Sequence, residues 1–226
     1  MRHVLLFAYG SLVSHGSLAA TLGRRSSAVA AGVPAVLHGH RRAWNVGSNR
    51  ESHPDRILTR ADGSPFTGTL AVLGLTPDPA ARTNGVLYRL AAADLEALAV
   101  RERNYAPLDV TGAVRAPGLR AAPSFEVVTF APTVPALERL LEARDARTAV
   151  VRVGYVQAVA HAFAAVGHGQ LATFRSTTTP HRLPAARLTL ETGRRRALPR
   201  STETPALGPR NHSATPPRAP HEPPQG

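Results

Sequence analysis

The sequence predicts an α+β domain built from short strands and amphipathic helices. Two apolar runs, His3–Ala8 and Gly85–Leu90, have the length and composition of buried strands. Apolar residues recur at helical spacing in Ala91–Val100 and Pro135–Arg144, which predicts helices that each pack one face against a core. At 226 residues and 43% hydrophobic content, the chain is long enough for one well-filled domain with an appendage.

The composition changes near Pro180. Half of the 20 prolines lie between this residue and Gly226, together with the basic cluster Arg194–Arg196 and little aliphatic periodicity. Such a segment cannot bury enough apolar surface to offset the entropy lost on ordering. We therefore expect a folded domain over residues 1–179 and a disordered Pro/Arg-rich tail over residues 180–226.

The other elements follow from local signals. Asp62 and Gly63 can form a hairpin turn between two strand-like runs. Pro107 prevents the helix before it from continuing, whereas Pro135 suits the first turn of the next helix. We predict further strands at Val33–Val46, Ile57–Thr59, Thr67–Leu73, Leu108–Val114 and Phe125–Phe130, helices at Ser17–Leu22 and Gly154–Val166, and loops at Ser48–Pro54 and Pro77–Ala81.

The basic composition is weak evidence for a nucleic-acid partner. The formal net charge is +12, but all 27 basic residues are arginine, which, with the Ala, Gly and Pro content, is typical of a GC-rich genome. The absence of lysine excludes a Walker-type phosphate lysine and a lysine Schiff base. The absence of cysteine excludes disulfides, thiolate metal sites and a cysteine nucleophile. No targeting segment or membrane span is apparent, so we expect a cytoplasmic protein with no membrane partner.

Two short motifs have ligand-binding character. The run Tyr9–Leu12, Tyr-Gly-Ser-Leu, leads from a predicted strand towards a helix, and such a turn exposes backbone N–H groups that can receive an anion. It does not match the GxGxxG pattern of dinucleotide sites. His38 and His40 would share one face of a strand, but no third ligand follows at typical spacing, so we expect hydrogen-bonded or surface histidines and no metal.

Glu102 is the acid on which the functional hypothesis depends. At about 100° per residue, it falls between Leu95 and Leu98 on the helix face expected in the core, whereas Arg101 and Arg103 point away. A buried carboxylate has to find donors or hold a proton, which is how a general acid/base near neutral pH arises. From periodicity alone, the alternative is a frayed helix end with a solvated Glu102 beside its arginines.

Four pieces of the sequence occur in an order and spacing known from one family. They are Phe7–Leu12 (FAYGSL), Gly39–Arg42 (GHRR), Asn84–Leu90 (NGVLYRL) and Arg101–Tyr105 (RERNY), with a looser match over Tyr155–Gly167. In this set the chain resembles the γ-glutamylcyclotransferase-like proteins, which include γ-glutamylcyclotransferases, γ-glutamylamine cyclotransferases and glutathione-specific members. The resemblance covers roughly residues 4–167.

The resemblance implies a small mixed, mostly antiparallel β-barrel with helices packed around it. It also implies a pocket with the Tyr-Gly-Ser turn on one wall and the glutamate on the other, so that Glu102 is the catalytic residue. The candidate substrate-binding residues are Tyr9, Gly10, Ser11 and Leu12, with Tyr105 and Tyr155 as further candidates. The chain departs from the family pattern at Leu12, where several members have asparagine, and at Phe130, where an aromatic residue, often tyrosine, is usual.

The family reaction cyclises a γ-glutamyl group to 5-oxoproline and releases an amine, amino acid or peptide. It needs no metal, cofactor or enzymatic nucleophile, which agrees with a chain without cysteine and lysine. The expected partner is a small-molecule γ-glutamyl substrate, whose leaving half we expect loops such as Ser48–Asp55 and Ala116–Ser124 to select. The sequence determines neither the chemical identity of the leaving half nor the oligomeric state. The alternatives are a non-catalytic small-molecule binding or regulatory protein on the same fold, and nucleic-acid binding by the basic tail.

Overall fold

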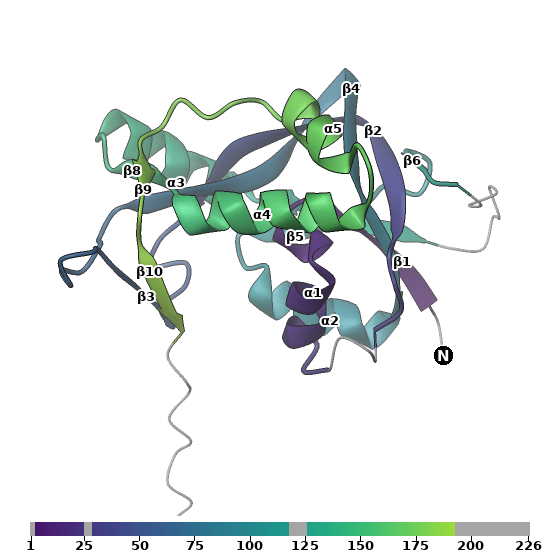
Figure 1. The fold of residues 1–226 in the computed structure, drawn as a ribbon, viewed down its shortest axis with the longest axis horizontal. Helices are drawn as coiled ribbons and strands as arrows, with labels where there is room; N and C mark the ends of the chain where they lie inside the picture. Colours follow the sequence, from purple (N-terminus) through teal and green to yellow (C-terminus); the bar gives the residue numbers. More distant parts are fainter. Residues whose placement is uncertain (1–2, 25–28, 118–125, 193–226) are drawn as a thin grey trace, which may run out of the picture. The chain divides into compact units, whose positions relative to one another are not determined.

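The structure, a computed structural model, describes residues 3–24, 29–117 and 126–192 of the chain (Figure 1). Contacts divide the chain into residues 1–194 and 195–226, and all described residues belong to the first unit. The strands are β1 (His3–Ala8), β2 (Val33–Ser48), β3 (Arg56–Thr59), β4 (Thr69–Ala91), β5 (Tyr105–Asp109), β6 (Val114–Arg115), β7 (Val127–Pro132), β8 (Ala149–Arg152), β9 (Ala185–Ala186) and β10 (Thr189–Thr192). The helices are the 3-10 helix η1 (Ser11–Val13), α1 (His15–Thr21), α2 (Ala92–Arg101), α3 (Val134–Asp145), α4 (Val153–Val166) and α5 (Gln170–Thr177).

Two long strands, β2 and β4, form the centre of the main sheet. They pair antiparallel along most of their length, and β1 pairs antiparallel with the last part of β4. The strand order is β5-β7-β1-β4-β2-β6, and β8 pairs in parallel with the start of β4. Because β1 lies between β4 and β7, the turn that follows its last residue is surrounded by other elements and does not lie at a sheet edge.

The sheet is mixed and mostly antiparallel, as predicted. Only the pairs β1–β7, β4–β8 and β8–β9 among the named strands are parallel. The path of pairings runs from β5 at one end to β6 at the other, and within the described chain these two strands do not pair with each other. The pairings therefore do not close the sheet into the predicted barrel.

The predicted loop Pro77–Ala81 is wrong, because these residues lie within β4. The pairing of β2 with β4 jumps from His38 opposite Arg82 to His40 opposite Pro77. An irregularity of this kind leaves residues 78–81, which include Pro79, without a partner in β2 and does not end the strand.

Most other predicted elements are confirmed within a few residues, and β1 has the predicted bounds. The predicted strand Leu108–Val114 is instead two strands, β5 and β6, separated by a turn. Asp109 favours this turn because its side chain accepts hydrogen bonds from the backbone N–H and the hydroxyl of Thr111, at 2.9 and 2.6 Å. The sequence signals predict neither β8 nor α5.

The folded part extends beyond the predicted boundary after residue 179. Residues 185–186 form β9, which pairs with β8, and residues 189–192 form β10, which pairs with β3 (Figure 1). The backbone groups of β9 and β10 find hydrogen-bond partners in β8 and β3, which are distant in sequence, so local composition does not predict these strands. Residues 193–226, the rest of the predicted tail, lie outside the described residues.

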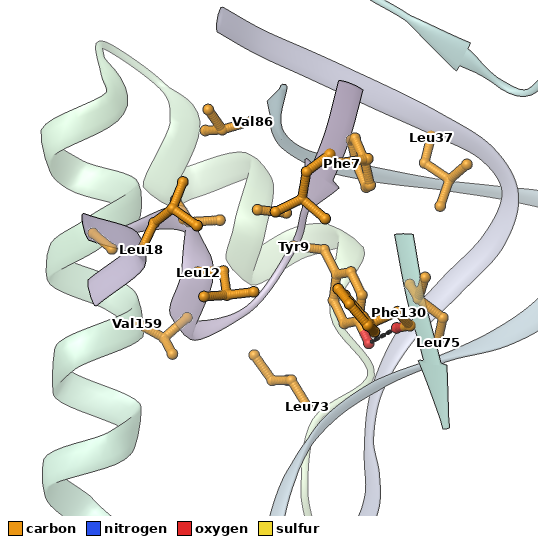
Figure 2. Packing of buried hydrophobic residues seen from close by; sticks show 14 of the residues in the cluster. Phe7, Tyr9, Leu12, Leu18, Leu37, Leu73, Leu75, Val86, Phe130 and Val159 are labelled. Carbon is orange, nitrogen blue, oxygen red and sulfur yellow. Dashed lines mark hydrogen bonds between the residues drawn. The ribbon is translucent and has the colours of Figure 1, made fainter. Parts of the chain in front are cut away.

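The hydrophobic core surrounds the end of β1 (Figure 2). Leu6 and Phe7 of β1 are almost fully buried, as are Leu18 of α1 and Leu98 of α2. Burial of these side chains holds α1 and α2, which contact each other, against the core near the turn after β1. No helix in the described part of the chain is long and apolar enough to cross a membrane.

Candidate active site

A small cavity of about 30 Å³ lies at the C-terminal end of β1. All the site residues predicted from the sequence, which come from η1, β5, α4 and the turns after β1 and α2, are among those that line it. The lining residues are Leu6, Phe7, Ala8, Tyr9, Gly10, Ser11, Leu12, Leu73, Glu102, Tyr105, Phe130 and Tyr155. The fold thus brings the predicted residues together, and their roles in chemistry stay a prediction.

Glu102 directly follows α2 and is largely buried. Its backbone N–H donates to the carbonyl of the buried Leu98 at 2.8 Å, which anchors it to the last turn of the helix. Its side chain is 14% exposed, so the alternative of a solvated, frayed helix end is wrong. Burial raises the pKa of the Glu102 carboxyl, and the positive charges of Arg101 and Arg56 oppose that rise. This carboxyl therefore exchanges its proton closer to neutral pH than an exposed glutamate does.

The prediction that Arg101 points away from Glu102 is also wrong. The Arg101 Nε lies 3.5 Å from the Glu102 Oε1. The guanidinium also donates to the Ser17 carbonyl and hydroxyl at 3.1 Å each, to the Thr21 hydroxyl, and to the Ser11 hydroxyl at 3.4 Å. Regular angular spacing does not extend past the helix end, and the long arginine side chain reaches α1. Arg101 therefore connects the acid to the turn on the other wall.

Residues 9–12 connect β1 to α1 through η1. The Gly10 carbonyl accepts a hydrogen bond from the Val13 N–H at 3.0 Å, so the N–H groups that precede this first donor have no acceptor within η1. Figure 2 shows Tyr9 directed towards Phe130, whose carbonyl accepts a hydrogen bond from the Tyr9 hydroxyl at 2.6 Å. This bond ties the turn to β7.

Gly10 lines the small cavity. A Cβ atom at this position would lie 3.6 Å from the Tyr155 Oη and 3.8 Å from the Leu73 Cβ, both ordinary van der Waals distances. Space for the methyl group of an alanine therefore exists, but that space is the cavity itself.

The two positions that depart from the family pattern both lie on the cavity wall. Leu12 and Phe130 are 7% and 4% exposed. Leucine in place of the asparagine found in several members makes the wall beside the turn apolar, so this side chain offers the cavity a packing surface and no hydrogen bond.

The backbone of Leu73 in β4 holds two tyrosines. The Tyr105 hydroxyl donates to the Leu73 carbonyl at 2.7 Å, and the Tyr155 hydroxyl forms a hydrogen bond with the Leu73 backbone. Burial raises the pKa of Tyr105 well above its usual value and that of Tyr155 to about 12, so both hydroxyls keep their protons at neutral pH. Leu73 acts through its backbone, which no side-chain pattern in a sequence can reveal.

Arg42 of β2 supports the site but was not predicted to do so. It is fully buried, and within the described chain no carboxylate pairs with it. Its guanidinium donates to the Tyr9 carbonyl at 3.2 Å and to the backbone and side-chain oxygens of Asn84 at 2.9 and 2.6 Å. It packs against the rings of Phe163 and Phe174, 4.8 and 4.6 Å from their centroids, and the two rings stack on each other at 4.6 Å. Burial lowers the pKa of Arg42 to about 9, so it stays charged at neutral pH.

The only sequence signal for Arg42 is its place in the resemblance. Arg42 and Asn84 belong to two of the four matching pieces, Gly39–Arg42 and Asn84–Leu90. Neither residue has a pattern of its own that predicts burial, because arginine and asparagine are mostly exposed.

A larger cleft of about 1120 Å³ shares Ser11, Glu102, Tyr105 and Tyr155 with the small cavity. Its outer wall includes the loop Ser48–Asp55, which the sequence predicts as a specificity loop. The second predicted specificity loop, Ala116–Ser124, lies mostly outside the described residues.

His53 anchors the loop after β2 to the end of α2. Its Nδ1 lies 3.2 Å from the Ser48 hydroxyl and 3.1 Å from the Ser52 hydroxyl, and it forms a hydrogen bond with the Arg101 backbone. Burial lowers the pKa of His53 to about 4, so the ring is neutral at pH 7. The loop is thereby positioned beside Glu102 without adding charge.

Within the described ranges, no three His, Cys, Asp or Glu side chains lie together as a metal site would need. The Nδ1 of His40 lies 3.3 Å from the His38 carbonyl, so this pair interacts locally along β2.

The chain is similar to several solved structures. No family model and no curated protein matches the sequence. The structure of YkqA from Bacillus subtilis is 18% identical over 82% of this chain and 57% of YkqA, with a TM-score of 0.52, which shows a shared fold. The chain therefore spans a little over half of that protein. Structures described as a γ-glutamyl cyclotransferase and as a glutathione-specific γ-glutamyl cyclotransferase from yeast match with TM-scores of 0.47 and 0.45, at 12% and 17% identity. They match over 82% and 80% of this chain and 94% and 100% of their own.

Proposed function

We propose that this chain, which has a γ-glutamylcyclotransferase-like fold, is an enzyme that cyclises a γ-glutamyl group to 5-oxoproline. The released half of the substrate is an amine, an amino acid or a peptide. One observation carries the proposal: the carboxyl of Glu102 lines the same cavity as the turn Tyr9–Leu12. The two segments are far apart in sequence, and the hydrogen bond between Arg101 and Ser11, which are 90 residues apart, connects them. The family motifs in the sequence support the same reaction.

The first requirement of this reaction is a folded substrate, because its own α-amine has to meet its γ-carbonyl. The γ-glutamyl group would enter from the large cleft and end against the small cavity, between the turn and Glu102. Holding reacting atoms in such a geometry can supply up to roughly 7–11 kcal/mol of the barrier.

The second requirement is proton transfer, which we assign to Glu102. The carboxylate takes one proton from the α-ammonium group, and the freed amine nitrogen bonds to the γ-carbonyl carbon to close the five-membered ring. As the C–N bond to the leaving half breaks, the protonated Glu102 returns a proton to the departing nitrogen. After ring closure Glu102, again a carboxylate, takes a second proton from the ring nitrogen and passes it to the amine, so that one of the three α-ammonium protons stays on the ring nitrogen and two end on the released amine. A positioned acid/base group of this kind contributes about 10²–10⁴ in rate.

The turn and the tyrosines would bind and orient the substrate. The N–H groups of residues 10–12 can donate to the substrate α-carboxylate or to the developing oxyanion, and the Ser11 hydroxyl can add a further donor. The Tyr9 and Tyr105 hydroxyls already donate to backbone carbonyls, so these residues form walls. Tyr155, whose hydroxyl faces Gly10, is the tyrosine placed to donate to substrate.

We expect kcat/KM to fall as the pH is lowered, and the midpoint of this fall should lie at a higher pH than the pKa of an exposed glutamate. Only the carboxylate form of Glu102 can accept the α-ammonium proton, and its pKa is raised by burial. Arg56→Gln removes a charge that lowers this pKa, so the acid limb should move to still higher pH. The measurement is the pH profile of kcat/KM for both proteins. An acid limb at the pH of a free glutamate, or one that moves the opposite way in the variant, contradicts the assignment.

Gly10→Ala is expected to fold normally and to lower kcat/KM by roughly tenfold or more, since misplacement by about 1 Å near reacting groups has effects of this order or larger. The added methyl group has room but occupies the cavity in front of Tyr155. Thermal unfolding and 5-oxoproline release measure the two effects separately. Gly112→Ala, in a turn where a Cβ would meet nothing within 4 Å, is the control. Unchanged turnover of Gly10→Ala would show that substrate does not approach the turn.

The direct test is incubation of the purified chain with a panel of γ-glutamyl amino acids, glutathione and γ-glutamylamines, with 5-oxoproline measured as product. We expect release from at least one compound. Saturable binding without any 5-oxoproline would instead favour the alternative of a binding or regulatory protein on this fold.

A further inference from the structure

The cleft beside Glu102 contains two arginines without partners. Arg56 begins β3 and Arg152 ends β8, and both are half-buried side chains on the cleft wall. Within the described residues, neither guanidinium makes a hydrogen bond or an ion pair. Arg101 on the same wall differs, because Glu102 and α1 hold its guanidinium.

The surroundings of these two arginines compensate their charge only in part, and no carboxylate among the described residues is in direct contact with either guanidinium. Burial lowers the pKa of Arg56, Arg101 lowers it further, and Asp55 and Glu102 raise it. Burial also lowers the pKa of Arg152, which only the hydroxyl of Tyr155 raises. Both side chains remain charged at neutral pH because the pKa of arginine starts above 12. A half-buried cation without a counter-ion is unfavourable, so an anion in the cleft would be stabilised.

The cleft also has room for a leaving half of substantial size. Its volume of about 1120 Å³ is at the upper end of ordinary ligand pockets, which hold roughly 300–1,000 Å³. The cleft wall also includes apolar side chains from β3, the segment after it and β10, namely Leu58, Phe66 and Leu190. This wall can pack against an apolar body carried by the same leaving half.

We infer that the leaving half of the substrate carries an anionic group, a carboxylate or a phosphate, that binds Arg56 and Arg152. The inference rests on the proposed function and narrows it, because a γ-glutamylamine with a neutral or cationic leaving half would leave both arginines unpaired. A guanidinium suits either anion, since its paired N–H groups match two oxygens.

Matched substrates test the inference. γ-Glutamyl-phenylalanine, its C-terminal amide and γ-glutamyl-phenethylamine share the aromatic body and differ in the anion, and γ-glutamyl-phosphoethanolamine supplies a phosphate. We expect kcat/KM to be about 10- to 100-fold higher for the better of the two anionic compounds than for the amide and the phenethylamine, from charge-assisted hydrogen bonds. The comparison between phenylalanine and phosphoethanolamine compounds identifies which anion is preferred.

Arginine variants identify the residues responsible. Arg56→Gln and Arg152→Gln should each lower kcat/KM for the anionic substrate about tenfold, mainly through a higher KM. The kcat/KM for the amide should change less than threefold. Both values are measured on the pH plateau of each protein. Arg56→Lys, which keeps the charge, should recover part of the loss. Arg82→Gln, an exposed arginine of β4 outside the cleft, is the control for the change in net charge.

Equilibrium binding to Glu102→Gln separates the two proposals. If no compound yields 5-oxoproline, the proposed function is wrong, and tighter binding of the acid than of its amide still supports the anion site. If 5-oxoproline is released equally from acid and amide, or if the arginine variants slow both alike, the anion inference is wrong and the proposed function stands.

Discussion

Glu102→Gln is expected to lower 5-oxoproline release by about 10²–10⁴-fold, the usual contribution of a positioned acid/base group. Glutamine keeps the shape of the side chain but cannot accept the α-ammonium proton. The loss should appear in kcat, because the substrate still binds between the turn and the cleft. The measurement is steady-state product release at saturating substrate, and wild-type turnover in the variant would show that Glu102 does not move the proton.

The stability of the same variant distinguishes catalysis from folding. The pKa of Glu102 is raised in the folded chain, so this carboxyl favours folding at a pH below its unfolded pKa, and that contribution is lost as the pH rises through the folded pKa. At pH 8 the Gln variant should therefore be at least as stable as the wild type, and at pH 4 the two should converge. Glu96→Gln, at an exposed position of the same helix, is the matched control and should change neither activity nor stability.

Arg42→Ala is expected to reduce the free energy of unfolding by about 3–5 kcal/mol. The change removes the donors of the Tyr9 and Asn84 oxygens and leaves a void beside the stacked rings of Phe163 and Phe174. At roughly 2–4 °C per kcal/mol for a chain of this size, Tm should fall by about 10 °C. Thermal and urea unfolding measure the effect.

The neighbouring residue is the control for Arg42. Arg41 lies on the same strand but is exposed, and it pairs with Asp78 at 2.6 Å on the surface. Arg41→Ala should cost about 1 kcal/mol or less, as exposed ion pairs do. Equal losses in the two variants would mean that the buried contacts of Arg42 do not stabilise the fold.

Local patterns were sufficient where an element depends on its own residues. The apolar run of β1, the periodic leucines of α2 and α3, and the turn at Asp62 and Gly63 are all confirmed, and their signals lie within a few residues of one another. The inward position of Glu102 also follows from such a pattern, because Leu98, one turn earlier, is drawn into the core.

Elements that depend on distant partners were missed or misplaced. The prolines of β4 predict a loop, but β2 supplies enough pairing on either side to keep the strand. Likewise β9 and β10 have little apolar character, and their strand conformation depends on hydrogen bonds to β8 and β3. Backbone pairing across the fold outweighs weak local preference.

By itself, the sequence determined that this is an α+β domain with an inward-facing acid, and its motifs selected the residues that line one cavity. Tertiary structure alone decided what surrounds that acid: Arg101 turned back towards it, Arg42 buried behind the turn, the Leu73 backbone between two tyrosines, and two unpaired arginines on the cleft wall. The physical reason is that burial and charge at a site are set by side chains from many elements, and their meeting depends on how the whole chain packs.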